Sequence, residues 1–269
     1  MILLNGKQLN LGHFPDNTLL LKESIPYDFE NYREATITWL FNYNEELVAL
    51  IYLTKHLRSH GVGDIYLKMP YIPNARQDRV KSDEDVFTLK HFADVINWLD
   101  FASVEVLDPH SYVSEALFNN LIVTSPRPMI EFIIEAAKQH TNDVSLFFPD
   151  EGSMKRYSGM FDMPYTFGMK KRDWKTGNIL GLDIVGDNDL IKGKTIIIID
   201  DICSRGGTFY HSAKKLKELG ADKIYLWVSH CENSILEGEL LRSKLIDKIY
   251  TTNSIFTKQH EGISVMKIW

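Results

Sequence analysis

The sequence predicts an α/β protein with two domains, each a mainly parallel sheet flanked by helices. Helical and strand-like segments alternate along the chain, and this alternation begins again in the second half. Such alternation is typical of parallel sheets, because two parallel strands need a crossover connection. A chain of 269 residues can hold two such domains. We expect them to be residues 1–125 and 126–269, divided near the two prolines of "TSPRPM" (124–129).

The first half contains two helix–strand units. In "EELVALIYLTKHLRSHG" apolar residues such as Leu47, Leu50 and Leu57 recur at helical spacing, and Gly61 ends the predicted helix before the strand "DIYLKMPY". A second amphipathic helix is predicted in "FTLKHFADVINWL", followed by the strand "ASVEVLD". We expect helices to cover both faces of this sheet.

The second half repeats this organisation. The segments "VSLFFPD" and "TIIIID" are predicted strands, and the second is apolar enough to be central in its sheet. The segment "FYHSAKKLKELGADKIYLWVSH" predicts a helix, its end at Gly220 and a returning strand.

Composition excludes several classes of function. The chain is 44% apolar and 25% charged, as in ordinary globular proteins. No apolar run is long enough for a membrane span and the first residues lack a basic leader, so we expect a cytoplasmic protein without membrane contact. The net charge of −6 argues against a broad nucleic-acid interface. Cys203 and Cys231 have no metal-site spacing and are expected to be reduced thiols.

Polar residues follow four of the predicted strands. The segments are "LKMPYIPNARQDR", "VEVLDPH", "LFFPDEG" and "IIIIDDICSRGGT". Because the carboxyl ends of parallel strands border the ligand crevice of an open sheet, residues distant in sequence can converge there. We therefore expect these segments to face one another across one cleft.

The last of these segments has the features of a sugar-phosphate site. Asp200 and Asp201 follow the apolar strand; one carboxylate can accept hydrogen bonds from sugar hydroxyls, and the other can orient the loop or hold metal-bound water. The next residues form a small turn at the start of a helix: Ser204, Gly206, Gly207 and Thr208. Free backbone N–H groups, hydroxyls and the positive end of a helix dipole favour a phosphate. A pentose 5′-phosphate fits this loop.

Taken in order, these motifs resemble the ribose-phosphate diphosphokinases, also called phosphoribosyl pyrophosphate synthetases. The similarity extends from "HFPDNT" to "ISVMKIW" and rests on six segments: "ARQDR" (75–79), "DPH" (108–110), "FPDEGSMKR" (148–156), "GMKKRD" (168–173), "IVGD" (184–187) and the DD…GGT loop. The resemblance implies transfer of the diphosphoryl group of ATP to the C1 hydroxyl of ribose 5-phosphate, with Mg²⁺, giving phosphoribosyl diphosphate and AMP. It also implies two phosphoribosyltransferase-like domains with the active site between them. A homo-oligomer, a dimer or hexamer, is expected, in which one subunit's ATP-binding loop completes a neighbour's site.

The resemblance also implies residue roles. The N-terminal domain would supply ATP contacts through Phe14, Asp16, Arg76 and Gln77. The C-terminal domain would bind the diphosphate with Asp150, Glu151, Gly152 and Ser153, and ribose 5-phosphate with Asp200, Asp201, Ser204, Gly206, Gly207 and Thr208. His110 and Asp150 match the metal ligands. Lys170 and Arg172, on a mobile loop, would stabilise the transition state together with His110, with Lys171 as the alternative register.

Three positions depart from the family's pattern. Ser204 and Arg205 stand where the family usually has an acid and a threonine, and Arg205 adds a cation that can bind the 5′-phosphate bidentately. Thr18 stands where the family commonly has an acid, which leaves the nucleotide preference open.

Two other functions fit part of the sequence. A phosphoribosyltransferase would share the ribose-phosphate loop and consume phosphoribosyl diphosphate with a nucleobase, but its chemistry requires neither "ARQDR" nor "DPH" nor a second domain. A non-catalytic regulatory homologue would have lost catalytic or metal-binding residues. Lys170, Arg172, His110 and Asp150 are all present, which favours the enzyme.

Overall fold

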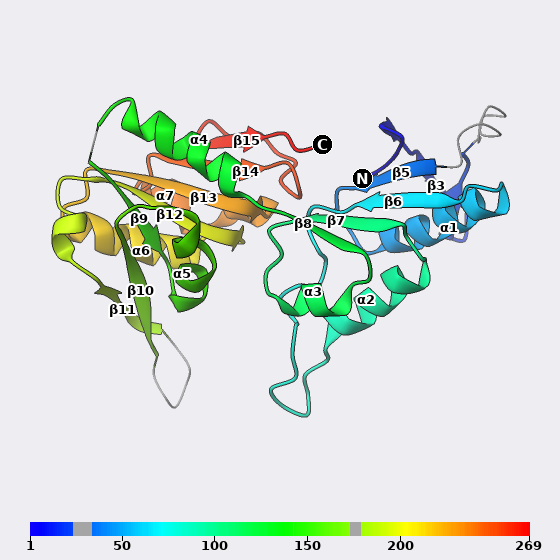
Figure 1. Cartoon of the computed structure of the whole chain (residues 1–269), viewed down its shortest axis with the longest axis horizontal. Helices are drawn as coiled ribbons and strands as arrows, with labels where there is room; N and C mark the ends of the chain where they lie inside the picture. Colours follow the sequence, from blue (N-terminus) through cyan, green and yellow to red (C-terminus); the bar gives the residue numbers. More distant parts are fainter. Residues whose placement is uncertain (24–33, 142, 173–178) are drawn as a thin grey trace. The chain divides into compact units, whose positions relative to one another are not determined.

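A computed structural model describes residues 1–23, 34–141, 143–172 and 179–269 of the chain. The chain divides into an N-terminal unit, Met1–Ser125, and a C-terminal unit, Pro126–Trp269. Each unit contains one large, mainly parallel sheet with helices packed against it, which confirms the predicted α/β class (Figure 1). Within the described ranges, none of the helices combines the length and the apolar character that a membrane crossing requires.

The N-terminal unit has a six-stranded sheet in the order β2-β1-β5-β6-β7-β8. The strands are β1 (Ile2–Leu4), β2 (Lys7–Gln8), β5 (Glu34–Trp39), β6 (Asp64–Lys68), β7 (Ser103–Leu107) and β8 (Leu121–Thr124). Strands β5 to β8 are parallel, and β1 runs antiparallel to both of its neighbours. A separate hairpin consists of β3 (Leu11–His13) and β4 (Leu19–Leu21).

Helices lie on one side of this sheet: α1 (Glu45–Ser59), α2 (Thr88–Trp98) and α3 (Val113–Leu117) (Figure 1). The predicted helix before Gly61 is confirmed, and Gly61 takes the left-handed conformation, with φ +82°. Alternate strand residues, among them Ile37 and Leu67, are fully buried in one apolar cluster with α1 and α2. The intervening Thr36 and Tyr66 are partly exposed, so among the described residues this face lacks the helical cover that we expected.

The C-terminal unit has a seven-stranded sheet in the order β11-β10-β9-β12-β13-β14-β15. The strands are β9 (Val144–Phe148), β10 (Tyr165–Arg172), β11 (Ile179–Val185), β12 (Thr195–Cys203), β13 (Lys223–Cys231), β14 (Lys248–Thr252) and β15 (Ile263–Met266). All neighbours are parallel except β10 and β11. The helices are α4 (Arg127–Lys138), α5 (Glu151–Tyr157), α6 (Gly207–Glu218) and α7 (Glu239–Ser243).

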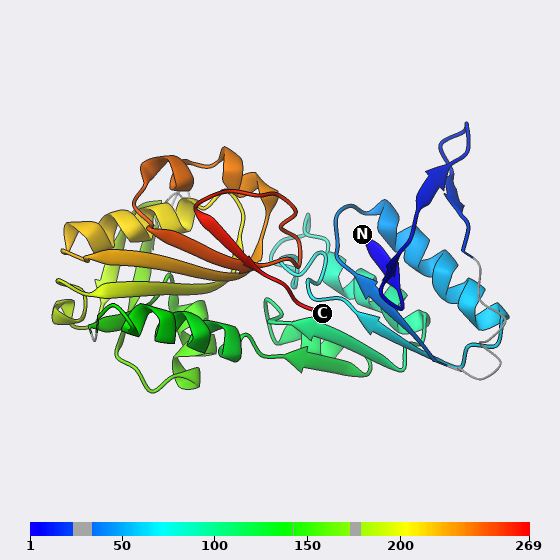
Figure 2. The ribbon, with the colours of Figure 1, turned by 90° about the horizontal axis from the view of Figure 1, so that it is seen from above.

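Strand β12 is central in the sheet, as its apolar sequence predicts. Ile196 and Ile198 pack into the cluster that contains α6, whereas Ile197 and Ile199 pack into the cluster that contains α4. Figure 2 shows α4 (green) and α6 (yellow) on opposite sides of the sheet. The alternation of strand side chains therefore buries this strand on both faces.

The position of the paired aspartates differs from the prediction. Asp200 and Asp201 lie inside β12 and do not follow it, because pairing with β13 continues to the partners Cys203 and Cys231. The strand thus holds the backbone of both aspartates in a fixed register, which the sequence pattern did not indicate.

Replacing Ile198 with alanine is expected to destabilise the C-terminal unit by about 2–5 kcal/mol, because it leaves a cavity in the core. Val265→Ala on edge strand β15 is the matched control, since the Val265 side chain is 39% exposed, and it should cost less than about 1 kcal/mol. Thermal unfolding followed by near-ultraviolet circular dichroism measures both. Equal losses in the two variants would contradict a central position for Ile198.

Candidate active site

The loop after β12 has the geometry of an anion-binding helix start. Helix α6 begins at Gly207, and Gly206 before it has φ +80°, which favours glycine. A side chain at Gly206 would also collide with Leu240, since a Cβ there would lie 2.8 Å from the leucine Cδ2. The first N–H groups of a helix have no acceptor inside it and are available to a ligand. The structure therefore builds the predicted turn of Ser204, Gly206, Gly207 and Thr208.

Three carboxylates lie near this loop. Burial separates the Asp200 carboxylate from solvent and raises its pKa well above the ordinary value. The negative charges of Asp201 and Asp150 raise this pKa further. Asp201 is 4% exposed and forms an ion pair with Arg156, at 3.3 Å between Oδ2 and Nη1. The carboxyl ends of β9 and β12 therefore converge, as the sequence predicts for two neighbouring strand ends.

Asp150 is the N-cap residue of helix α5. Its Oδ1 accepts a hydrogen bond from the backbone N–H of Ser153 at 3.1 Å, and its own N–H donates to Ser153 Oγ at 3.3 Å. This capping box fixes the turn predicted for the diphosphate, which also includes Glu151 and Gly152. A Cβ at Gly152 would lie 3.2 Å from Asp150 Oδ1, so the turn leaves little space for a larger residue.

In the N-terminal unit, the "ARQDR" and "DPH" segments come together at Asp78, which sequence reasoning did not select. Asp78 is 5% exposed and accepts two hydrogen bonds from Arg79, at 2.7 and 2.8 Å. Arg79 lowers the pKa of Asp78, with further lowering by Ser111 and His110. His110 therefore lies near the Asp78–Arg79 pair and is partly exposed. The aspartate of the "ARQDR" motif was the signal available in the sequence.

Arg76 and Gln77, the two residues of this motif that are predicted to contact ATP, are both exposed. Gln77 already contacts the start of α2: its Oε1 accepts a hydrogen bond from Thr88 Oγ1 at 2.7 Å, and its carbonyl accepts one from Leu89 N–H at 3.3 Å. Gln77 thus orders the loop that carries Arg76.

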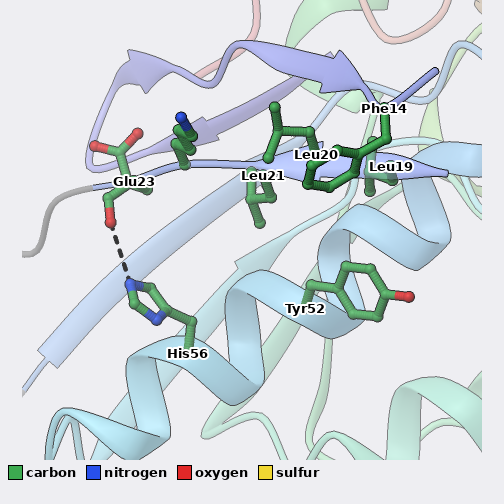
Figure 3. Close-up of a pocket in the computed structure, with 8 residues that line it drawn as sticks. Phe14, Leu19, Leu20, Leu21, Glu23, Tyr52 and His56 are labelled. Atoms are coloured by element: carbon green, nitrogen blue, oxygen red, sulfur yellow. Dashed lines mark hydrogen bonds between the residues drawn. The ribbon is translucent and has the colours of Figure 1, made fainter.

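The β3–β4 hairpin carries the other predicted ATP contacts. Asp16 accepts hydrogen bonds from the N–H and the hydroxyl of Thr18, at 3.0 and 2.7 Å, which lower its pKa. Phe14 is 51% exposed and borders a pocket of about 750 Å³. Figure 3 shows the hairpin leucines and Phe14 on one side of this pocket and Tyr52 and His56 of α1 on the other. The ring of Phe14 is therefore accessible beside an apolar surface.

Lys170 and Arg172 lie at the end of β10, where they pair with Leu182 and Ile179 of β11. We expected them in a loop; instead the antiparallel pairing with β11 extends the strand through both residues. Asp173, the last residue of the "GMKKRD" motif, lies outside the described residues.

The predicted metal ligands belong to different units, His110 to the first and Asp150 to the second. Among the described residues, no group of three or more histidine, cysteine, aspartate or glutamate side chains is arranged to hold a metal ion by itself. A site shared by His110 and Asp150 stays a prediction.

Sequence reasoning missed the acidic segment after β13. Glu232 Oε2 accepts a hydrogen bond from Ser204 Oγ at 2.5 Å, and Glu237 forms an ion pair with Arg205 at 3.4 Å. Both side chains of the second pair are largely exposed, at 75% for Arg205 and 69% for Glu237. The signal was present in "CENSILEGE", which follows the strand beside β12.

The chain is similar in sequence to ribose-phosphate pyrophosphokinases along most of its length. A family profile described as "Phosphoribosyl synthetase-associated domain" matches residues 174–268. A ribose-phosphate pyrophosphokinase from Thermococcus kodakarensis is 27% identical over 257 residues, which cover 93% of this chain and 86% of that protein. Ribose-phosphate pyrophosphokinase 1 from Listeria monocytogenes is 29% identical over 232 residues, which cover 83% of this chain and 70% of that protein.

A solved structure has the same fold. The crystal structure of phosphoribosylpyrophosphate synthetase from Mycobacterium smegmatis matches with a TM-score of 0.74 and 18% sequence identity, over 97% of this chain and 86% of that one. The similarity in sequence extends across both units, and the fold is shared over nearly the whole chain. The chain is therefore similar in sequence to ribose-phosphate pyrophosphokinases over most of its length, and it has the fold of a phosphoribosylpyrophosphate synthetase.

Proposed function

We propose that the protein transfers the diphosphoryl group of ATP to the C1 hydroxyl of ribose 5-phosphate, giving phosphoribosyl diphosphate and AMP. The observation that carries this proposal is the end of β12, where two carboxylates, a left-handed glycine and a helix start follow one another. Sugar hydroxyls need acceptors and a phosphate needs N–H donors. This order of groups supplies both within the span of one sugar phosphate.

In this proposal, Asp200 and Asp201 accept hydrogen bonds from the ribose hydroxyls. The N–H groups at the start of α6, with Thr208, bind the 5′-phosphate. Arg205 adds a mobile positive charge, because its exposed ion pair with Glu237 contributes little stability and can be exchanged for a phosphate. The turn at Asp150 to Ser153 receives the diphosphate.

ATP contacts are proposed for the N-terminal unit. Arg76 supplies a cation for the phosphates, and the exposed ring of Phe14 supplies a face on which a purine can stack. Asp16 is held by Thr18, which orients its carboxylate at the tip of the hairpin. The tip of the same hairpin, with Phe14 and Asp16, is exposed, which supports a homo-oligomer, a dimer or hexamer, in which the tip reaches a neighbouring subunit. We further propose that the enzyme is cytoplasmic.

The donor set fits Mg²⁺. The Asp150 carboxylate is close enough to raise the pKa of Asp200, so these groups repel one another unless a cation or a proton lies between them. Mg²⁺ commonly uses one or two protein carboxylates and takes its other ligands from water and substrate phosphates. Asp150, with His110, would hold it. When bound, the ion would neutralise charge on the diphosphate oxygens.

In the reaction, the C1 oxygen forms a bond to the β-phosphorus of ATP. The bond between the β-phosphorus and the oxygen that bridges it to the α-phosphate breaks, that oxygen leaves with AMP, and the hydroxyl proton is released. Negative charge builds up on the departing AMP oxygen and on the transferred group. We assign Lys170 and Arg172 to this charge, because cationic donors stabilise a transition state most when they face developing charge.

Incubation with ATP, Mg²⁺ and ribose 5-phosphate should release AMP and form phosphoribosyl diphosphate, and AMP release should depend on ribose 5-phosphate. Separation of the nucleotides by ion-exchange chromatography measures both. If phosphoribosyl diphosphate is instead consumed with a nucleobase, the protein is a phosphoribosyltransferase. Absence of both reactions would favour a regulatory homologue.

Lys170→Ala should lower kcat by about a hundred- to a thousandfold, with a much smaller change in KM, because the lysine acts mainly on the transition state. Lys171→Ala is the matched control, since it removes an identical side chain from the next position. Steady-state kinetics with both substrates measures the effect. Full activity of Lys170→Ala with loss in Lys171→Ala would move the assignment by one residue.

Arg205→Ala should raise KM for ribose 5-phosphate about tenfold or more, because one charge-assisted contact to the phosphate is lost. Glu237→Gln should leave this KM unchanged or lower it, since it removes only the competing carboxylate. KM for ATP should stay within about twofold of the wild type, as neither change touches the proposed ATP contacts. An unchanged KM for ribose 5-phosphate in Arg205→Ala would contradict this role.

A further inference from the structure

The loop after β12 rests on a second segment of the C-terminal unit. This supporting segment comprises residues 232–240, which follow β13 and include the short 3₁₀ helix Asn233–Glu237. The backbone N–H of Glu232 donates to the carbonyl of Cys203 at 2.8 Å, so the β12–β13 pairing continues into the segment. Glu232 is thereby fixed beside the first residue of the loop.

The carboxylate of Glu232 is held by two hydroxyls. Its Oε2 accepts hydrogen bonds from Ser204 Oγ at 2.5 Å and from Ser234 Oγ at 3.0 Å, and the side chain is partly buried. A hydrogen bond from a hydroxyl to an ionised carboxylate is among the stronger ones in proteins. Ser204 has a single proton to donate and gives it to Glu232. Its oxygen is then an acceptor toward a ligand, and the donors for a phosphate must come from the backbone, Arg205 and Thr208.

The next two loop residues also pack against the supporting segment. A Cβ at Gly238 would lie 1.9 Å from the carbonyl oxygen of Arg205, so only glycine fits there. A Cβ at Gly206 would lie 2.8 Å from the Leu240 side chain. Three successive loop residues, Ser204 to Gly206, thus contact the supporting segment, through one hydrogen bond and two close backbone approaches.

We propose that Glu232 is a positioning residue that sets the ribose 5-phosphate loop in its binding conformation through Ser204. The identity of the sugar phosphate rests on the proposed function. Glycine loses more conformational freedom on ordering than other residues, so fixing Gly206 and Gly207 for ligand binding has an entropic cost. The contact of Glu232 with Ser204 orders the loop before the phosphate arrives, which strengthens binding without touching the ligand.

The test measures ribose 5-phosphate binding by titration calorimetry and the kinetics of AMP release in three variants. Glu232→Ala should weaken ribose 5-phosphate binding about tenfold, because it removes the carboxylate that holds Ser204. Glu232→Gln keeps a hydrogen-bond acceptor and should recover most of this loss. KM for ATP should stay within about twofold of the wild type. Glu239→Ala, at an exposed carboxylate of α7, is the matched control and should bind normally.

A double-mutant cycle tests the route through Ser204. If Glu232 acts through this hydroxyl, Ser204→Ala combined with Glu232→Ala should weaken binding no more than the stronger single change. Additive losses would overturn the route. Should Glu232→Ala fail to fold, Ser204→Ala carries the same test, because it removes the same hydrogen bond without leaving a large cavity.

The remaining outcomes separate this proposal from the proposed function. Normal ribose 5-phosphate binding by a folded Glu232→Ala overturns the positioning role while AMP formation stands. A lower melting temperature with equal losses for both substrates also overturns it, since it indicates a merely structural role. If the wild type binds ribose 5-phosphate and the variants weaken as expected but no AMP forms, the proposed function fails and the positioning role holds. Absence of ribose 5-phosphate binding by the wild type overturns both.

Discussion

The parallel pairing of β12 with β13 is the constraint on which the rest of the candidate site depends. Apolar packing on both faces holds β12 in the centre of its sheet, and the pairing extends to Cys203 and Cys231. Both strand ends therefore stop at the same level, one leading into the loop and the other into Glu232. Without this register, the carboxylates, the glycine turn and its support would not meet.

The charges around the strand end divide into two kinds. Asp201 forms an ion pair with Arg156, both of them mostly buried, so its charge is balanced within the protein. Burial raises the pKa of Asp200, and the negative charges of Asp201 and Asp150 raise it further. A cation or hydroxyl donors would stabilise the Asp200 carboxylate, whereas an anion would be stabilised at the start of α6 a few residues later. One strand end thus offers adjacent places for the sugar and for its phosphate.

Local patterns in the sequence predicted part of this arrangement, and non-local pairing decided the rest. The helix before Gly61, the strand of four isoleucines and the glycine turn depend on spacing and on φ preferences, which neighbouring residues specify. The extension of β12 through two aspartates, and of β10 through Lys170 and Arg172, depends on partner strands, which polar residues in a single sequence do not reveal. Glu232 was missed for the same reason, since its contact with Ser204 spans 28 positions.

The two loop positions that depart from the family's pattern, Ser204 and Arg205, differ in their surroundings, and this assigns them different roles. Ser204 is tied to a partly buried carboxylate that a second hydroxyl also holds, so it has little freedom and serves the shape of the loop. Arg205 pairs with Glu237 in solvent, where an ion pair is screened and worth at most about 1 kcal/mol. A dianionic phosphate can bind both Arg205 and the N–H groups of α6. It is therefore a stronger partner for Arg205 than a single solvent-exposed carboxylate. Ser204 therefore shapes the loop, whereas Arg205 can exchange Glu237 for the phosphate of the ligand.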